Sequence, residues 1–444
     1  MGDQKKISEW TVFFLLKSVG GSIGEAINML NELRKINYGN EINLVLCLHV
    51  VKSYIPAIIA GDSNLIKGKT DQEKTTVFYR FRQKDEGEDG FLNDLDSLGD
   101  EPKFDITDPV YVQGFFRDKI LTQSTAKRYM LFTWDHGDGF GIFSSTDPEE
   151  GEPSKSQLVN LQFTKQLPVI GIKFNNIERR SVPDQDKVLT MDELATAIQR
   201  AFDTQKIDLV VMLNCYMQFF DAGYALRNNI KYLVAPQSYM FFNGYNYSFI
   251  FRKLVQDPQQ SSRKLAKCIV QSFETKLYTD QAGGFATKAG TALFAVDVAY
   301  YSEMADALDE LASALNGELK ERTPELIMAR NWVYPVNGAT QAVDFINMLE
   351  SIRKTLGNNW NSKLMRKLMA LKKKAVIEGY IGKNFFSDIL ASNPSGFSIF
   401  FPFRLIVDNG VSSKLNVDLF ANTSFGKDKS WNKFVKIFDG IKSS

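Results

Sequence analysis

The chain has 444 residues, of which 44% are hydrophobic, and its 53 basic and 52 acidic side chains leave a formal charge of +1. This length supports one large domain plus an appendage, and the balanced charge argues against a polyanion such as nucleic acid as a partner. Three cysteines form no disulfide framework, and no apolar run is long enough for a membrane-spanning helix.

Apolar runs and helical periodicity alternate along the first hundred residues. Residues 10–16 and 42–48 are continuous apolar runs that predict buried strands, and apolar residues at helical spacing over 23–33 predict a helix between them. Residues 76–81 alternate in polarity and predict a strand with one face toward solvent. The acid- and glycine-rich residues 85–101 predict a solvated loop.

The middle of the chain repeats strand, helix, strand, which predicts an α/β fold with a mostly parallel sheet wound on both faces. Asp108 and Pro109 open a helix as its N-cap and its first residue. The elements expected here are that helix to about residue 121, a strand over 129–133, an irregular loop over 140–158, a helix over 191–202, and strands over 207–213 and 232–235.

Beyond about residue 290 the pattern becomes mainly helical. Helices are expected over 298–315, 342–356 and 364–376, with a single strand over 396–402 that ends at a proline. We therefore divide the chain into a main domain over 8–290 and a smaller, helix-rich α/β region over 291–444 that packs on it.

Two strand ends carry the strongest chemical signal. His136, one of only two histidines, follows the apolar run 129–133, and Cys215 follows the apolar run 207–213. Parallel strands end at one edge of a sheet, so the pattern predicts a thiol nucleophile beside an imidazole base. The imidazole and a helix starting after Cys215 would both lower the thiol pKa, and the N–H groups of Gly137 and Cys215 would stabilise an oxyanion.

Simpler interpretations stay open for the reactive residue types. Cys215 could be a buried, inert thiol and His136 an ordinary loop residue. We interpret Cys47 as structural, His49 as a residue at the rim, and Cys268 as packing, because no further histidine or cysteine lies near enough in sequence to complete a metal site. Residues 85–101 could bind calcium but lack the EF-hand spacing, so we predict no metal ligands and no required cofactor, with calcium as an option.

Several ordered motifs resemble the clostripain-like cysteine peptidases, which have a caspase-like fold. Trp134 to Phe140 is similar to the family's "WDHGxGW", and Cys215 to Met217 with Asp221 to Tyr224 is similar to "DxCxM…ExAY". Further likenesses cover the opening strand over 10–16, "DxxDP" at 105–109, the strand over 232–235, "DGW" at 243–245 and "GLSIYFP" at 395–402.

The resemblance implies that His136 and Cys215 form a catalytic dyad, with Gly137 in the oxyanion hole, and that relatives cleave after Arg or Lys. Two acidic positions linked to that preference are Leu213 and Asn243 here. Burying a cation without a countercharge costs several kcal/mol, roughly the penalty of one unpaired buried ion, so we predict cleavage after a neutral or apolar residue. The substrate contacts that we predict are Asp135, Leu213, Asn214, Asn243, Gly244 and Tyr245.

The resemblance also implies self-cleavage in the loop after the histidine strand, sometimes with calcium. In residues 144–158 the only basic residue is Lys155, so loss of basic specificity predicts that the chain stays uncut. Our leading interpretation is a monomeric cysteine endopeptidase acting on peptide or protein substrates. The alternatives are a catalytically weak caspase-like module that binds peptides or proteins, and another acyl transfer through the same thiol. A secreted or periplasmic location follows if an export signal was removed, and a cytoplasmic one otherwise.

Overall fold

The structure is a computed structural model. It describes residues 7–19, 22–69, 73–84, 90–137, 139–143, 188–238, 240, 244–275, 291–333, 335–337, 342–382, 394–401 and 420–441.

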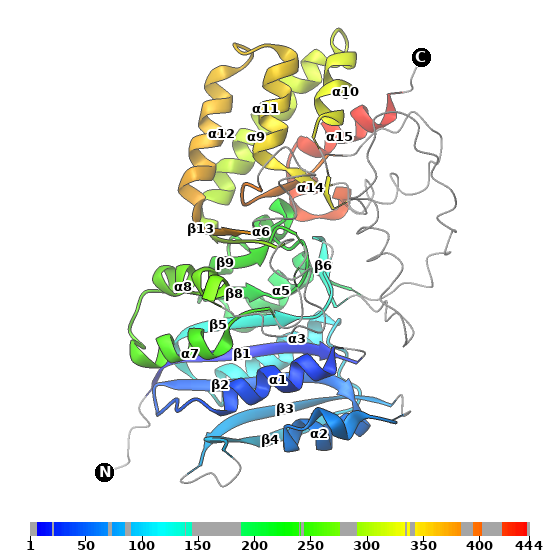
Figure 1. Ribbon diagram of the computed structural model, residues 1–444. Helices are drawn as coiled ribbons and strands as arrows, with labels where there is room; N and C mark the ends of the chain where they lie inside the picture. The colour runs from blue at the N-terminus through cyan, green and yellow to red at the C-terminus, as the bar shows by residue number, and fades with distance from the viewer. Residues whose placement is uncertain are drawn as a thin grey trace.

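A nine-stranded mixed sheet forms the centre of the molecule, in the order β13-β10-β9-β8-β5-β1-β2-β3-β4 (Figure 1). The five central strands, from β9 to β2, are parallel to one another. The two strands at each edge, β10 with β13 and β3 with β4, are joined by antiparallel pairings. The strands are β1 (Ser8–Ser18), β2 (Ile42–Val51), β3 (Lys74–Gln83), β4 (Asn93–Glu101), β5 (Ala126–Trp134), β8 (Ile207–Met212), β9 (Ile230–Pro236), β10 (Ala292–Asp297) and β13 (Val376–Ile381).

Two small sheets accompany the large one. The first joins β11 (Pro335–Asn337), β12 (Ala342–Asp344) and β14 (Ser398–Phe400), and the second pairs β6 (Gly141–Ile142) with β7 (Leu189–Thr190). The longer helices are α1 (Ile23–Arg34), α2 (Ile55–Ala60), α3 (Pro109–Phe115), α5 (Met191–Phe202), α6 (Phe220–Leu226), α7 (Tyr247–Gln256), α8 (Ser262–Thr275), α9 (Tyr301–Glu318), α10 (Thr323–Asn331), α11 (Phe345–Leu356), α12 (Ser362–Ala375), α14 (Ser424–Asp428) and α15 (Trp431–Gly440).

Helices cover both faces of the large sheet, because its central strands are apolar on both sides. Along β1, Phe13 and Leu15 enter a core shared with α3, α5 and α6, whereas Val12 and Phe14 enter a second core with α1, α7 and α8. Alternating side chains of a strand point to opposite faces, so a continuous apolar run requires a covering layer on each side. The predicted α/β sheet, largely parallel and flanked by helices, is confirmed.

Most predicted elements are present, and the largest error lies at one sheet edge. Residues 93–101, expected in a loop, form β4, which pairs antiparallel with β3. The prediction was wrong because an edge strand can place its acidic side chains in solvent and still complete its hydrogen bonds on one side. Residues 85–89 of the same acidic segment lie outside the described residues.

The chain beyond residue 290 contributes strands as well as helices. Neither β10 nor β13 was predicted, yet both belong to the large sheet, and β10 pairs antiparallel with β9. Residues 342–344, expected at the start of a helix, form β12. A short buried strand and a buried helical turn look alike in sequence, which explains these misses. The proposed domain boundary at residue 290 stays a prediction.

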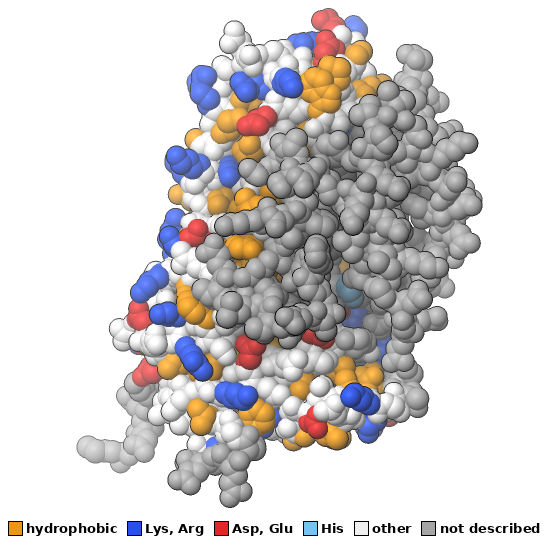
Figure 2. All heavy atoms as spheres, in the orientation of Figure 1, with side chains coloured by type: hydrophobic (Ala, Val, Ile, Leu, Met, Phe, Trp, Pro, Cys, Tyr) orange, Lys and Arg blue, Asp and Glu red, His pale blue; other side chains and the backbone are white. Residues whose placement is uncertain are grey.

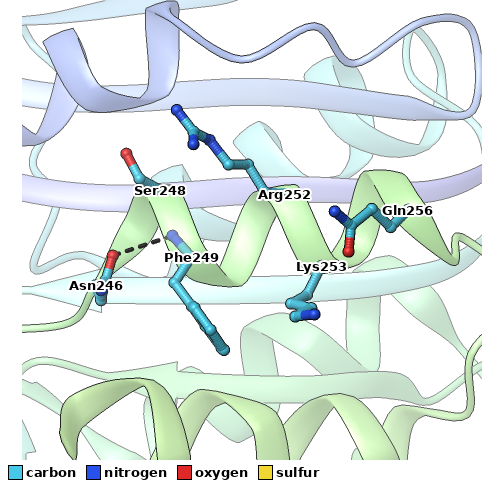
Figure 3. A pocket seen from close by; sticks show the side chains of 6 residues that line it. All are labelled: Asn246, Ser248, Phe249, Arg252, Lys253 and Gln256. Carbon is cyan, nitrogen blue, oxygen red and sulfur yellow. Dashed lines mark hydrogen bonds between the residues drawn. The ribbon is translucent and has the colours of Figure 1, made fainter. Parts of the chain in front are cut away.

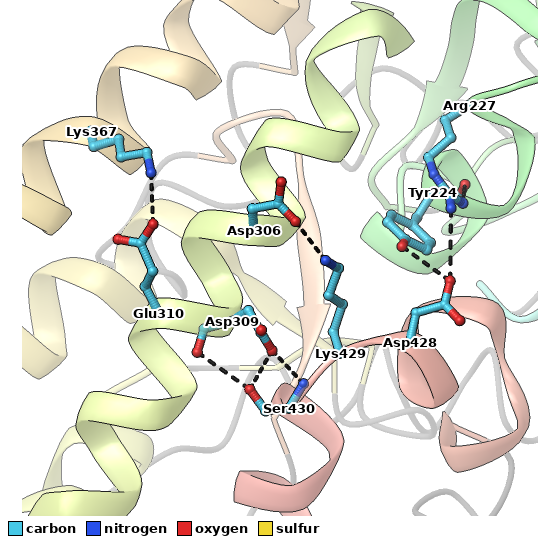
Figure 4. A network of polar contacts seen from close by, with 9 residues as sticks. All are labelled: Tyr224, Arg227, Asp306, Asp309, Glu310, Lys367, Asp428, Lys429 and Ser430. Carbon is cyan, nitrogen blue, oxygen red and sulfur yellow. Dashed lines mark hydrogen bonds and ion pairs between the residues drawn. The ribbon is translucent and has the colours of Figure 1, made fainter.

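The last helices are fixed to the rest of the molecule by polar contacts at the place where α14 ends and α15 begins (Figure 4). The Ser430 N–H, at the start of α15, donates to the Asp309 carboxylate of α9 at 2.6 Å, and Lys429 pairs with Asp306 at 2.5 Å. The Tyr224 hydroxyl of α6 donates to Asp428 at 3.1 Å. A carboxylate at a helix N-terminus satisfies N–H groups that lack a partner within the helix. These contacts connect the C-terminal helices to α6, the helix that follows Cys215.

The surface carries both signs of charge. On the face shown in Figure 2, Lys and Arg side chains alternate with Asp and Glu, and apolar patches lie between them. This mixture agrees with the formal charge of +1. Among the described helices, none has both the length and the apolar character needed to cross a bilayer.

Candidate functional site

The two strand ends singled out by the sequence are neighbours. Strands β5 and β8 are parallel, with Thr133 in register with Met212, and the Leu213 N–H extends the pairing by donating to the Thr133 carbonyl at 2.9 Å. His136 follows β5 and Cys215 follows β8. Ligands of open α/β sheets bind beyond the carboxyl ends of parallel strands, which is where these residues lie.

Gly137 lies against the main chain of the cysteine strand. A β-carbon placed on it would lie 2.7 Å from Asn214 Cβ and 2.9 Å from the Cys215 carbonyl oxygen. Real β-carbons are not found so close to a backbone oxygen, so any larger residue would push the two segments apart. Glycine at this position thus lets the His136 segment approach Cys215.

The Asn214 carboxamide joins the two strand ends. Its Nδ2 donates to the carbonyl oxygens of Asp135 and His136, both at 3.1 Å, and its Oδ1 accepts from the Thr133 hydroxyl at 2.6 Å. The side chain is fully buried. We predicted Asn214 as a substrate contact, and in this conformation its carboxamide instead bonds to two backbone carbonyls and to the Thr133 hydroxyl.

The thiol of Cys215 lies between the two backbone polar groups of Met240. The Met240 N–H donates to Sγ at 3.3 Å, and Sγ donates to the Met240 carbonyl at 3.4 Å. Burial raises the pKa of the Cys215 thiol to about 11; the Met240 hydrogen bond opposes this rise, and the negative charge of Asp135 adds to it. The thiol is therefore protonated at neutral pH in this conformation.

The thiol pKa and the nearby helix differ from the sequence-based expectation. We predicted a lowered pKa for the Cys215 thiol, and burial outweighs the stabilising influences here. A helix dipole was expected to contribute, but α6 begins at Phe220, and a turn at Cys215 and Tyr216 lies between the thiol and the helix. The dipole effect falls off within about one turn of a helix end, so α6 starts too far along the chain to help. Tyr216, in between, adopts a φ of 63°, a left-handed value that is uncommon for a residue with a side chain.

Asp135 forms a buried ion pair. Its Oδ2 lies 3.5 Å from Lys17 Nζ at the end of β1, and both side chains are at least nine-tenths buried. Lys17 also donates to the Phe143 carbonyl at 3.0 Å. The acid whose charge acts on Cys215 thus already has a positive partner. Its predicted role as a substrate contact stays a prediction.

The other predicted substrate contacts are buried or outside the described residues. Leu213 packs in the core shared with α7, and Tyr245 is fully buried with its hydroxyl donating to the Met212 carbonyl at 2.8 Å. Gly244 is buried as well. Asn243 and the residues 144–158, including Lys155, lie outside the described residues. Leu213 and Tyr245 pack beneath the end of β8 in this conformation. Their contact with substrate stays a prediction.

Cys47 has the structural role expected of it, and the roles predicted for His49 and Cys268 stay predictions. Cys47 is fully buried in the core, and burial raises the pKa of its thiol. His49 Nδ1 lies 2.8 Å from the Thr76 hydroxyl on the neighbouring strand. Cys268 is half-buried on α8. Within the described ranges, no three His, Cys, Asp or Glu side chains converge to hold a metal ion.

Sequence analysis missed three residues of the site. Lys17 had a visible signal, since it directly follows the apolar run 10–16 and a lysine at a buried strand end is almost never fully buried unless it is paired. Thr133 and Met240 carry no such signal, because their roles depend on contacts with residues far away in the chain. The C-terminal motif also reaches the site: the Ser398 N–H donates to the Gln218 carbonyl at 3.0 Å, which fixes the segment after Cys215.

A shallow pocket lies elsewhere, along the outer side of α7 (Figure 3). Its lining comes from that one helix and its N-cap, where Asn246 accepts from the Phe249 N–H at 3.0 Å. None of the residues predicted for the catalytic site takes part in it.

A family model identifies the protein family of the chain. The model of the clostripain family, Peptidase_C11, matches residues 180–438, which is more than half of the chain and includes Cys215. The chain belongs to the clostripain family of cysteine peptidases. His136 lies before the matched range, so its assignment rests on the geometry and the motif around it. No curated protein matches the chain.

Solved structures show that the whole fold is shared with clostripain-family proteases. A secreted C11 cysteine protease from Bacteroides thetaiotaomicron is 13% identical, with a TM-score of 0.61 over 96% of this chain and 100% of that chain. The same kind of protein with an irreversible peptide inhibitor gives 15% identity and a TM-score of 0.58 over the same shares. An inactive zymogen C11 protease from Parabacteroides distasonis is 14% identical, with a TM-score of 0.58 over 96% of this chain and 99% of that chain. At these identities the likeness concerns the fold.

Proposed function

We propose that this clostripain-family member is a cysteine endopeptidase with a caspase-like arrangement, in which Cys215 is the nucleophile and His136 the acid and base. The observation that carries the proposal is the direct contact between the Gly137 and Cys215 segments at the ends of two adjacent parallel strands. Two segments so far apart in the sequence have no need to touch. A nucleophile and its base must lie within hydrogen-bonding reach of each other, and this contact provides for that.

The reaction uses groups of the chain alone. His136 takes the proton from Sγ, and the thiolate attacks the scissile carbonyl carbon to form a C–S bond and an oxyanion that accepts from the N–H groups of Gly137 and Cys215. The oxyanion collapses, the C–N bond breaks, and the imidazolium gives its proton to the leaving amine. Water, deprotonated by His136, then attacks the thioester, and the C–S bond breaks to release the acid and restore the thiol.

The described conformation is a resting one for this chemistry. A thiol that donates to the Met240 carbonyl must give up that bond before its proton can pass to the imidazole. The raised pKa of the thiol keeps the thiolate population small until then. Substrate binding or a rearrangement around Met240 would supply the change, and a thiol held protonated in the free enzyme limits side reactions.

The substrate side chain before the cleaved bond is proposed to be neutral or apolar. The acid that acts on Cys215 is Asp135, and Lys17 already neutralises it within a buried pair. Leu213, two residues before the nucleophile, is apolar and buried, so it supplies no countercharge. A cationic substrate side chain bound beside Cys215 would lose its hydration without gaining an ion pair.

Two measurements test the proposal. Cys215→Ala and His136→Ala should each abolish cleavage of a peptide mixture and labelling by a peptidyl acyloxymethyl ketone, whereas Cys268→Ser should leave both unchanged. Cleavage that survives in Cys215→Ala would refute the assignment of the nucleophile. Failure of the wild-type chain to cleave or to be labelled by varied peptides would favour the weak binding module.

Specificity is tested separately with the same mixture. The wild-type profile should favour apolar residues before the cleaved bond over Arg and Lys. Leu213→Asp or Asn243→Asp should raise the share of Arg and Lys, and Leu213→Asn, which is similar in size but uncharged, should not. A wild-type profile dominated by Arg or Lys would overturn the specificity while leaving the dyad intact.

A further inference from the structure

The hydrogen bonds of Asn214 make it the direct connection between the two proposed catalytic segments. Asn214 immediately precedes Cys215, and all three of its partners belong to β5 or to the residues after it. Both amide hydrogens are used, one on the Asp135 carbonyl and one on the His136 carbonyl. The carboxamide is therefore fully committed to holding the histidine segment beside the cysteine segment.

We propose that Asn214 is a positioning residue, whose carboxamide fixes the main chain of His136 so that its imidazole meets the Cys215 thiol. This inference rests on the proposed dyad. It replaces the earlier expectation that Asn214 touches substrate, because a fully buried carboxamide with three internal partners has no surface left to offer.

The orientation of the carboxamide is determined by its partners. Two carbonyl oxygens can only accept, so they select the Nδ2 end, and the Thr133 hydroxyl donates to the Oδ1 end. A flipped amide would place Oδ1 against two carbonyl oxygens. An ionised aspartate at this position has the same shape but no donor, and a protonated one can donate to only one of the two carbonyls, so either form loosens the His136 segment.

The chain provides a matched control at the far edge of the sheet. Asn93 is also buried, and its Nδ2 donates to two backbone carbonyls, those of Arg34 at 3.1 Å and Ile36 at 2.7 Å. Asn93 lies on β4, an edge strand that is separated from β5 by β1, β2 and β3. Its replacement by Asp disturbs the same kind of hydrogen bonds without touching the site.

The experiment compares Asn214→Asp with Asn93→Asp in the full-length protein. Urea denaturation gives the folded fraction, and kcat and KM for an apolar peptide are expressed per folded molecule. Asn214→Asp should lower kcat about a hundredfold, the usual effect of a displacement of about 1 Å in a catalytic group, with KM changed less than about threefold. Asn93→Asp should lose comparable stability and keep kcat within about twofold.

A second readout follows the imidazole itself. The pH profile for inactivation by a peptidyl acyloxymethyl ketone should move to higher pH in Asn214→Asp, because a displaced imidazole stabilises the thiolate less. Thr133→Val keeps the side-chain shape and removes only the hydroxyl. It is therefore the variant to measure if Asn214→Asp folds poorly. The loss of one hydrogen bond, on the order of 1 kcal/mol, predicts a fall in kcat of about fivefold to tenfold.

The outcomes separate this inference from the dyad. If Cys215→Ala is inactive but Asn214→Asp and Thr133→Val keep wild-type kcat and pH profile, the positioning role is wrong and the dyad stands. An equal loss of kcat in Asn93→Asp would also overturn the positioning role, since general loosening would then explain both. Activity that survives in Cys215→Ala would remove the dyad and the inference with it.

Discussion

The ends of β5 and β8 and the junction of the C-terminal helices both rely on polar contacts, but the contacts differ in kind. At the strand ends, Asn214 and the Lys17–Asp135 pair are buried and bonded largely to backbone. At the junction in Figure 4, the carboxylates are partly or largely exposed, as in the pairs Lys367–Glu310 and Lys429–Asp306. Burial, more than the number of contacts, decides how much one substitution changes.

Lys17→Met should have the largest effect on stability. Removing one partner of a buried ion pair leaves the other charged and unpaired, which costs about 3–5 kcal/mol of unfolding free energy. Urea denaturation measures the loss. Lys52→Met, which breaks an exposed pair with Glu73, is the control and should change stability by less than about 0.5 kcal/mol. Equal effects of the two substitutions would show that the buried pair is not special.

Asp221→Asn should stabilise the protein at pH 8 by on the order of 3 kcal/mol. Burial raises the pKa of Asp221 to about 7, although the Thr423 hydroxyl at 2.7 Å favours the ionised form. A raised folded-state pKa stabilises the fold fully below about pH 4 and loses that stability as pH rises toward 7. The advantage of the asparagine variant should therefore be large at pH 8 and vanish near pH 4, as followed by urea denaturation.

Asp309→Asn provides the comparison of opposite sign. Asp309 is partly buried, and burial raises the pKa of its carboxyl, but the stronger combined action of its Ser430 hydrogen bonds and nearby lysines lowers it overall. A lowered folded-state pKa gives stability that is present above the unfolded pKa and lost as pH falls through the folded pKa. The variant should thus be less stable than wild type at pH 8 and similar to it in acid. The same sign for both variants would contradict the pKa directions.

Alkylation should reveal the protonated resting thiol. At neutral pH, Cys215 should react with iodoacetamide about a hundredfold more slowly than an exposed thiol with a pKa near 9, because its own pKa is about 11. Asp135→Asn should speed the reaction, since it removes a negative charge that raises the thiol pKa. Peptide mapping distinguishes Cys215 from Cys268. A Cys215 rate equal to that of an exposed thiol would contradict the protonated resting state.

The smallest effect is expected at the exposed side of the junction. Lys367 and Glu310 are 2.8 Å apart but largely solvent-exposed, so Lys367→Ala should lower the unfolding free energy by less than about 0.5 kcal/mol. The difference should shrink further at 1 M salt, because exposed charges are screened. A loss above about 2 kcal/mol, measured by urea denaturation, would show that the junction is as sensitive as the strand ends.

Local patterns in the sequence were sufficient for the elements that hold the site. The apolar runs of β1, β2, β5 and β8 were recognisable because strands buried on both faces need apolar residues throughout. Asp108 and Pro109 identified the start of α3, where Asp108 accepts from the Val110 N–H at 2.8 Å. The strands β4, β10 and β13 were not found, because an acidic edge strand and short strands paired with distant residues carry no distinctive local pattern.

The sequence by itself determined the α/β fold, the order of the strands that carry His136 and Cys215, and membership of the clostripain family. Periodicity and motifs are properties of neighbouring residues, so they can be read without coordinates. Only the tertiary structure decided that Asn214 bonds to the backbone of the His136 segment, that Lys17 pairs with Asp135, and that the Cys215 thiol is hydrogen-bonded to Met240. Burial, hydrogen bonding and pKa depend on which distant residues exclude water from a group, and folding alone brings those residues together.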